Sequence, residues 1–400
     1  MIERPLYLDR LRRLRGTSLA KVLTGMRRAG KSGILRLLEQ QLLEEGVVAD
    51  AILVLDLELM QNERLRDAEA LLAHVRERAS RAGTTYVMLD EAQQARGIGR
   101  VAYALMEEGR YDLYLTGSHA RLVERELYDA LAGRYVEIPV FPLSFAEYHA
   151  AHAVGTAAAS PPELFERYLQ NGGLPQALLF ERDPYALREY LDGVYNTVVR
   201  RDVSCGLGKE DPALLDAITR HLMTHVGMPI SANGVSRALT SGGSSCSDDT
   251  VSLYLRALVE AHAFHRVRRL DLKTGMRLKT QERYYADDLG IRSVLLGAGR
   301  PSLQGLLENV IYLELRRRYR EVDVGRHYTR HISFVARSGE GREYYQVAPS
   351  VLDPALLERS LAPLRAERDH YPKTLLTLDA VGTGSHDGIR HLNAIDWLLA

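Results

Sequence analysis

The sequence predicts an α/β fold in which a parallel sheet with helices on both faces opens the chain. Five short apolar strands alternate with helical segments over residues 17–148, which is typical of such a sheet. Right-handed crossovers place the carboxyl ends of these strands at one edge of the sheet. A helical segment and two smaller units of helices and strands follow. The five strands are expected at residues 21–24, 51–58, 86–90, 113–116 and 135–140.

The first of these strands runs into a glycine loop. Residues 25–32 read Gly-Met-Arg-Arg-Ala-Gly-Lys-Ser and match G-x-x-x-x-G-K-[ST] in full, and a helix is expected over residues 34–43. Strand, loop and helix together form the context in which this pattern cradles phosphates. A chance match is expected in only about one chain in a hundred of this length. The residues expected to bind the nucleotide here are Gly25, Arg28, Ala29, Gly30, Lys31, Ser32 and Gly33.

This loop predicts ATP and Mg²⁺ as ligands. Lys31 is expected to reach the β- and γ-phosphates, and the Ser32 hydroxyl is expected to ligate Mg²⁺. The strand over residues 86–90 ends in two acids. Asp90 is the predicted partner of Ser32 at the metal, and Glu91 is the predicted general base for an attacking water. A solvated turn is the alternative for two such acids, but the complete loop upstream favours the functional interpretation.

Polar residues also mark the end of the strand over residues 113–116. Thr116 and Ser118 stand there. Because parallel strands bring their carboxyl ends to one edge, both residues are candidates to sense the γ-phosphate. An ordinary turn is the alternative.

Composition favours a multidomain protein of the cytoplasm. The 400 residues are 46% hydrophobic and carry a formal net charge of +0, so any basic surface must be local. Two cysteines, Cys205 and Cys246, exclude a disulfide framework and a zinc quartet. No signal peptide and no membrane-spanning stretch is apparent. His221 and His225 have the spacing of a metal pair, but no third ligand is evident, so ordinary histidines are preferred.

The second half of the chain changes character. Residues 149–162 are rich in Ala, Ser, Gly and Pro and predict a linker, and helices follow to about residue 210. Residues 211–290 predict three helices and a β-hairpin, which is the outline of a winged helix-turn-helix. From residue 301 a helix and several strands predict a small mixed α/β unit.

The hairpin of the predicted winged helix is basic. Residues 265–285 contain only Asp271 and Glu282 as acids. Such a hairpin suits non-specific contact with duplex DNA, although the helix before it begins with Asp248 and Asp249. A solvated hairpin packed on the protein is the alternative. The basic residues are Arg266, Arg268, Arg269, Lys273, Arg277, Lys279 and Arg283.

Taken together, these motifs resemble a bacterial and archaeal family of AAA-type ATPases with a C-terminal domain of unknown function. The resemblance implies a P-loop domain at 1–150, a helical lid at 160–210, a winged helix at 211–290 and a restriction-endonuclease-like domain at 301–400. Arg134 would then be a candidate cation for the transition state, in cis or from a neighbouring subunit of an oligomer, with Arg200 and Arg201 as rivals. The phrases that carry the resemblance lie at residues 24–32, 89–93, 115–118, 131–135, 141–148, 172–175, 201–202, 308–315, 345–347 and 371–373.

The last of these domains departs from the nuclease pattern. Ser333, Tyr344 and Gln346 stand where such a nuclease needs an Asp and a Glu-x-Lys pair, and Glu308 and Glu314 cannot build the site alone. We expect no nuclease activity there, and a docking surface for a protein partner instead. The sequence therefore predicts an ATP hydrolase that works as a nucleotide-driven switch between ATP and ADP forms. The alternative is a nucleotide-stabilised interaction module with negligible turnover.

Overall fold

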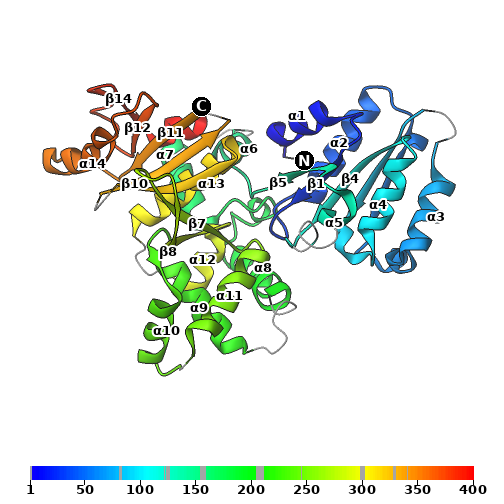
Figure 1. Ribbon diagram of the computed structural model, residues 1–400, viewed down its shortest axis with the longest axis horizontal. Helices are drawn as coiled ribbons and strands as arrows, with labels where there is room; N and C mark the ends of the chain where they lie inside the picture. Colours follow the sequence, from blue (N-terminus) through cyan, green and yellow to red (C-terminus); the bar gives the residue numbers. More distant parts are fainter. Residues whose placement is uncertain are drawn as a thin grey trace. The chain divides into compact units, whose positions relative to one another are not determined.

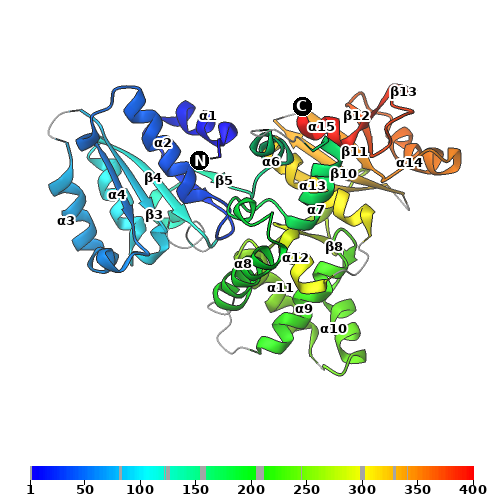
Figure 2. The same cartoon turned by 180° about the vertical axis from the view of Figure 1, so that it is seen from behind.

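The chain folds into two compact units, shown in Figures 1 and 2, and each is described by itself. The first comprises Met1–Pro142 with Glu260–His262, and the second Leu143–Val259 with Ala263–Ala400. The computed structural model describes residues 2–80, 83–120, 122, 127–153, 159–203, 211–244, 246–297, 302–327, 330–339 and 341–400.

The first unit is built on a parallel sheet, as predicted. Its strands, five among the described residues, lie in the order β2-β3-β4-β1-β5, and every neighbouring pair is parallel. The carboxyl ends of β1 and β3, which carry the glycine loop and the two acids, therefore share one edge. The strands are β1 (Ala20–Thr24), β2 (Ile52–Asp56), β3 (Thr85–Asp90), β4 (Tyr111–Gly117) and β5 (Tyr135–Pro139).

Helices cover both faces of this sheet (Figures 1 and 2). On one face, alternate strand residues such as Val22, Leu89 and Leu115 pack against the apolar sides of α3, α4 and α5. On the other face lies α2, against which α1 packs with Tyr7 and Leu11 buried. The helices are α1 (Pro5–Leu14), α2 (Lys31–Glu44), α3 (Ala68–Arg78), α4 (Ile98–Glu107) and α5 (Tyr128–Leu131).

The second unit begins with helices. A π-helical turn over Asn196–Val203 extends α8. The predicted linker at 149–162 begins inside α6 and ends at the beginning of α7, and Cys205 lies outside the described residues. In the part of the chain described, no helix is long and apolar enough to cross a bilayer. The helices are α6 (Phe145–His152), α7 (Pro161–Asn171), α8 (Pro184–Tyr195), α9 (Pro212–Thr224), α10 (Ala232–Ser241) and α11 (Asp248–Glu260).

A mixed sheet forms the rest of the second unit. Among the described residues it has nine strands, in the order β13-β14-β12-β11-β10-β9-β7-β8-β6. The predicted hairpin is β7 and β8, but β7 also pairs in parallel with β9. The hairpin is therefore continuous with the C-terminal strands. The strands are β6 (Pro229–Ile230), β7 (Phe264–Asp271), β8 (Arg277–Ala286), β9 (Glu321–His327), β10 (Arg330–Ser338), β11 (Gly341–Val347), β12 (Lys373–Thr377), β13 (Gly384–His386) and β14 (Ile389–Asn393).

Helix α13 (Leu303–Arg318) ties this sheet together. Most of its residues are buried, including polar Asn309, whose side-chain amide donates to the carbonyl of Ala286 and accepts from its N–H. The Tyr312 ring stacks on Tyr285 of β8 at a centroid distance of 4.6 Å. A buried amide that satisfies both backbone groups of one strand residue fixes the position of the helix along the sheet. The remaining helices are α12 (Leu289–Leu296), α14 (Pro354–Ala366) and α15 (Ala394–Leu399).

Candidate active site

The loop between β1 and α2 has the backbone that phosphate binding requires. Gly25 has a φ of +150°, and a Cβ there would lie 2.1 Å from the carbonyl oxygen of Val140, so only glycine fits. Gly30 has a φ of 104° and precedes α2, whose first N–H groups face the loop. Arg28 is also left-handed, with a φ of 71°. Successive turns of this kind direct backbone N–H groups inward and form an anion-binding concavity.

Lys31 lies inside this loop. Its side chain is buried, and its Nζ donates to the carbonyls of Gly25 at 2.8 Å and Met26 at 2.9 Å. These carbonyls hold the ammonium where phosphates of a bound nucleotide would lie. Ala29 is fully buried and Gly33 follows in the first turn of α2, so their expected contribution to binding is through backbone N–H groups.

Asp90 meets Ser32 and Thr116 at the carboxyl end of β3. The Thr116 hydroxyl donates to Asp90 Oδ1 at 2.5 Å, and the Ser32 hydroxyl also hydrogen-bonds this carboxylate. Burial raises the pKa of Asp90, and these two hydrogen bonds oppose the rise. A hydroxyl and a buried carboxylate in direct contact fit a hard divalent cation such as Mg²⁺, whose charge would stabilise the ionised acid.

Glu91 adopts a strained backbone conformation. Its φ is 52° and its ψ is 49°, a left-handed conformation that non-glycine residues rarely adopt and that clusters at functional sites. Its N–H donates to Thr116 Oγ1 at 2.8 Å. Its Oε2 accepts from Ser118 Oγ at 2.8 Å and from Gln93 Nε2 at 2.5 Å. The structure therefore brings both predicted sensor residues against the two acids.

Three residues at this edge were not predicted from the sequence. Gln93 bridges Glu91 and Ser118. Arg27 Nη1 lies 3.8 Å from Glu91 Oε2, and it donates to both carboxylate oxygens of Glu58, which follows β2. The sequence signal for Arg27 was its place in the loop, next to Arg28. The loop pattern allows any residue at both positions, so it assigns neither arginine a role.

Comparison with known proteins agrees with this geometry. Residues 17–149 match the family described as AAA domain, and residues 162–302 match a domain of unknown function (DUF8612). An uncharacterized protein of Haemophilus influenzae is 31% identical over 401 residues, which cover 100% of this chain and 99% of the relative.

This chain belongs to the family of that Haemophilus protein. Its first unit is an AAA-type ATPase domain, as expected. A more distant relative in this comparison is the uncharacterized protein MJ1544 of Methanocaldococcus jannaschii, 24% identical over 74% of this chain and 66% of its own length. The Walker-type ATPase paby2304 of Pyrococcus abyssi shares the fold, with a TM-score of 0.50 and 15% identity over 74% of this chain and 96% of its own.

Arg134 does not reach the AAA site within its own chain. Its carbonyl accepts from the N–H of Ala20 at the beginning of β1, which is the edge of the sheet opposite the glycine loop. Its guanidinium pairs with Glu107 at 2.6 Å. The in-cis alternative for Arg134 is therefore not supported, because the parallel strands separate it from the loop, and its action from a neighbouring subunit stays a prediction. Of its rivals, Arg200 pairs with Asp216 inside the second unit.

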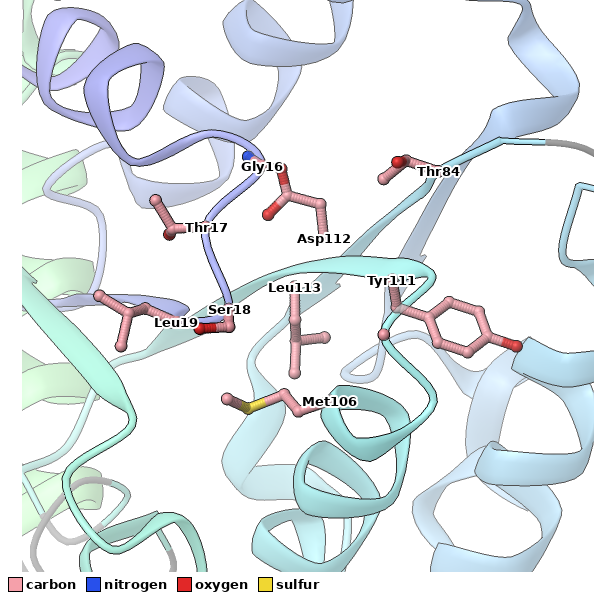
Figure 3. A pocket seen from close by; sticks show the side chains of 10 residues that line it. Gly16, Thr17, Ser18, Leu19, Thr84, Met106, Tyr111, Asp112 and Leu113 are labelled. Carbon is pink, nitrogen blue, oxygen red and sulfur yellow. Dashed lines mark hydrogen bonds between the residues drawn. The ribbon is translucent and has the colours of Figure 1, made fainter.

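A small pocket of about 150 Å³ also lies at that opposite edge (Figure 3). Asp112 lies beside Gly16 in its lining, and the two are joined by a hydrogen bond of 2.9 Å from the Gly16 N–H. Asp112 also forms a buried ion pair with Lys21 at 2.5 Å and accepts from the Tyr114 hydroxyl. The hydrogen bonds and the ion pair of Asp112 therefore stabilise this edge of the AAA domain, which is far from the predicted nucleotide-binding loop.

Glu308 in the second unit is likewise enclosed by donors. Oε1 accepts from Gln304 at 2.9 Å and Ser333 Oγ at 3.2 Å, and Oε2 accepts from Arg283 at 2.8 Å and the Tyr285 hydroxyl at 3.2 Å. The Ser333 N–H bonds Gln346, whereas Tyr344 turns to Asp369. An arginine thus pairs with the carboxylate that accepts from Ser333, and the absence of nuclease activity stays a prediction.

We therefore expect the full chain to leave single- and double-stranded DNA and RNA intact in Mg²⁺ or Mn²⁺. The physical reason is that Glu308 is already paired with Arg283, and that among the described residues no group of three or more His, Cys, Asp or Glu side chains could hold a metal ion. The measurement is gel analysis after prolonged incubation. Cleavage that persists through purification and disappears in Glu308→Ala would contradict the prediction.

The surface of the β7–β8 hairpin is less basic than the number of Lys and Arg residues in its sequence suggests. Arg269 is buried and donates to Gln281, and Arg277 pairs with Asp323. Arg283 is the partner of Glu308. Among the described side chains of the hairpin, Arg266, Arg268, Lys273 and Arg277 are exposed, and the first two approach Glu282 at 4.0 and 3.9 Å. The side chain of Lys279 lies outside the described part. The expected DNA contact therefore has weaker support.

Proposed function

We propose that this chain binds Mg-ATP in the loop at residues 25–32 and hydrolyses it. The observation that carries the proposal is the meeting of Lys31, Ser32, Asp90 and Glu91 at one edge of the parallel sheet. Asp90 contacts Ser32, and Glu91 is held by Ser118, so groups from three separate strands converge where the loop turns. Convergence of a phosphate-binding loop, a metal-ligand pair and a base is what phosphoryl transfer to water requires.

Each residue has a distinct role in this proposal. The loop N–H groups and Lys31 bind the phosphates, and Ser32 and Asp90 would hold Mg²⁺, which supplies charge neutralisation when bound. Glu91 orients the attacking water and accepts its proton. Thr116 and Ser118 position the two acids through the hydrogen bonds that they donate.

We further propose that turnover is slow and serves as a switch between ATP and ADP forms, with the second unit as the responding part. The engagement of Glu91 Oε2 by Ser118 and Gln93 supports slow turnover, because two donors on one oxygen restrict how the carboxylate can turn toward a water. The same observation favours the second candidate function, an interaction module that binds nucleotide with negligible turnover. Turnover of the wild-type chain under excess Mg-ATP separates the two.

Lys31→Ala tests nucleotide binding. The substitution removes a charge-assisted contact with the phosphates, so we expect ATP affinity to fall by about 1.5–3 kcal/mol in titration calorimetry. Arg36→Ala removes a cation from the exposed face of the same helix and is expected to bind like wild type. Equal affinity of Lys31→Ala and wild type would refute the assignment of this loop.

A further inference from the structure

Arg27 occupies a position in the glycine loop that the loop pattern does not specify. It follows Met26, whose carbonyl accepts from Lys31, so the loop that carries Arg27 is the one that cradles the phosphates. Its side chain is only 11% exposed although it carries a full charge. A charged side chain held so far from water must have a defined set of partners.

Two of those partners are carboxylates at the carboxyl edge of the sheet. Arg27 Nη1 donates to Glu58 Oε1 at 2.9 Å and Oε2 at 3.1 Å, and it lies 3.8 Å from Glu91 Oε2. Glu58 is 42% exposed, whereas Glu91 is 9% exposed. The guanidinium therefore lies between a solvated acid and the proposed general base.

We propose that Arg27 is the cation that contacts the γ-phosphate in cis, and that the Glu58 carboxylate competes with this phosphate for the Arg27 guanidinium. This inference rests on the proposed ATP hydrolysis. A guanidinium fork matches phosphate oxygens in a bidentate manner, and the terminal phosphate of ATP carries more charge than the half-exposed carboxylate of Glu58. Arg27 needs only a side-chain rotation, because its backbone already belongs to the phosphate-binding loop.

The position of Arg27 also explains how the site works without Arg134 from the same chain. Arg134 lies at the opposite edge of the sheet and pairs with Glu107. Arg27, in contrast, lies beside Glu91, where the attacking water and the γ-phosphate would meet. Negative charge that develops on the γ-phosphate oxygens would be stabilised by a cation at this place.

The test compares ATP with ADP, since only ATP has the γ-phosphate. In Arg27→Gln we expect ATP affinity to fall by about tenfold or more while ADP affinity changes little, and kcat to fall by about 10³-fold. Arg27→Lys keeps the charge without the fork, so it should recover part of the ATP affinity but little of kcat. Glu58→Gln removes the competing carboxylate, so its preference for ATP over ADP should rise. Arg36→Gln, on the exposed face of α2, is the matched control and should resemble wild type.

The outcomes separate this inference from the proposed function. If wild type binds neither ATP nor ADP, the proposed function fails and Arg27 has no substrate to contact. If wild type binds and hydrolyses ATP but Arg27→Gln keeps the same ATP-to-ADP ratio and kcat, only the inference fails. An equal loss of both nucleotides in Arg27→Gln would also overturn it, because that result indicates a role in loop structure. Glu58→Gln keeps the inference testable if Arg27→Gln does not fold, since a falling preference for ATP in that variant contradicts it.

Discussion

Glu91→Gln is expected to bind ATP as tightly as wild type and to hydrolyse it about 10²-fold or more slowly. Glutamine has the size of glutamate and still accepts from the Ser118 hydroxyl through its amide oxygen. It adopts the same left-handed backbone at similar cost, so the loop after β3 should not move. It cannot accept a proton from water, and turnover is lost for that reason. The measurement is steady-state phosphate release together with calorimetric ATP binding.

Glu77→Gln is the control for this substitution. Glu77 is exposed on α3 of the same domain, so removal of its charge should leave both binding and turnover unchanged. If Glu91→Gln released phosphate at the wild-type rate, Glu91 would have no part in the mechanism. If wild type itself released none, the interaction-module function would be favoured.

Asp112→Asn is expected to destabilise the AAA domain by about 3–5 kcal/mol. The substitution leaves the Lys21 ammonium buried without its counter-charge, since the two side chains are 0% and 2% exposed and lie 2.5 Å apart. The double variant Lys21→Met with Asp112→Asn should recover much of this loss, because no buried charge then remains. Amide hydrogen exchange in β1 and β4 measures the effect locally, which suits a chain of two units.

Glu108→Gln provides the comparison, because it breaks a partly exposed ion pair with Arg76 in the same domain. We expect it to cost less than about 1 kcal/mol. Unchanged exchange rates in Asp112→Asn, or a loss no larger than that of Glu108→Gln, would show that water reaches Lys21 and that the network at this edge is not structural.

Local sequence patterns predicted the AAA domain and most of the residues proposed for its site. Alternating apolar strands and helices predicted the parallel sheet, which has five strands among the described residues, and the loop pattern at residues 25–32 located Lys31 and Ser32. The position of Asp90 and Glu91 at a strand end then placed them at the edge that holds the loop. These features could be predicted because each depends on residues close in sequence, and a parallel sheet brings all strand ends of one kind together.

Contacts between residues far apart in sequence determined the remaining features, and only the tertiary structure shows these contacts. Arg134 lies near a strand in sequence but at its amino end, so it falls at the edge opposite the loop. The sequence of residues 264–286 predicts a hairpin. In the structure β7 also pairs with β9, so the hairpin is part of a sheet that has nine strands among the described residues. The partners of Arg27 and Lys21 lie 31 and 91 residues away. Charge pairs of this kind leave no local pattern, because their energies depend on burial and distance in the folded chain and not on spacing along it.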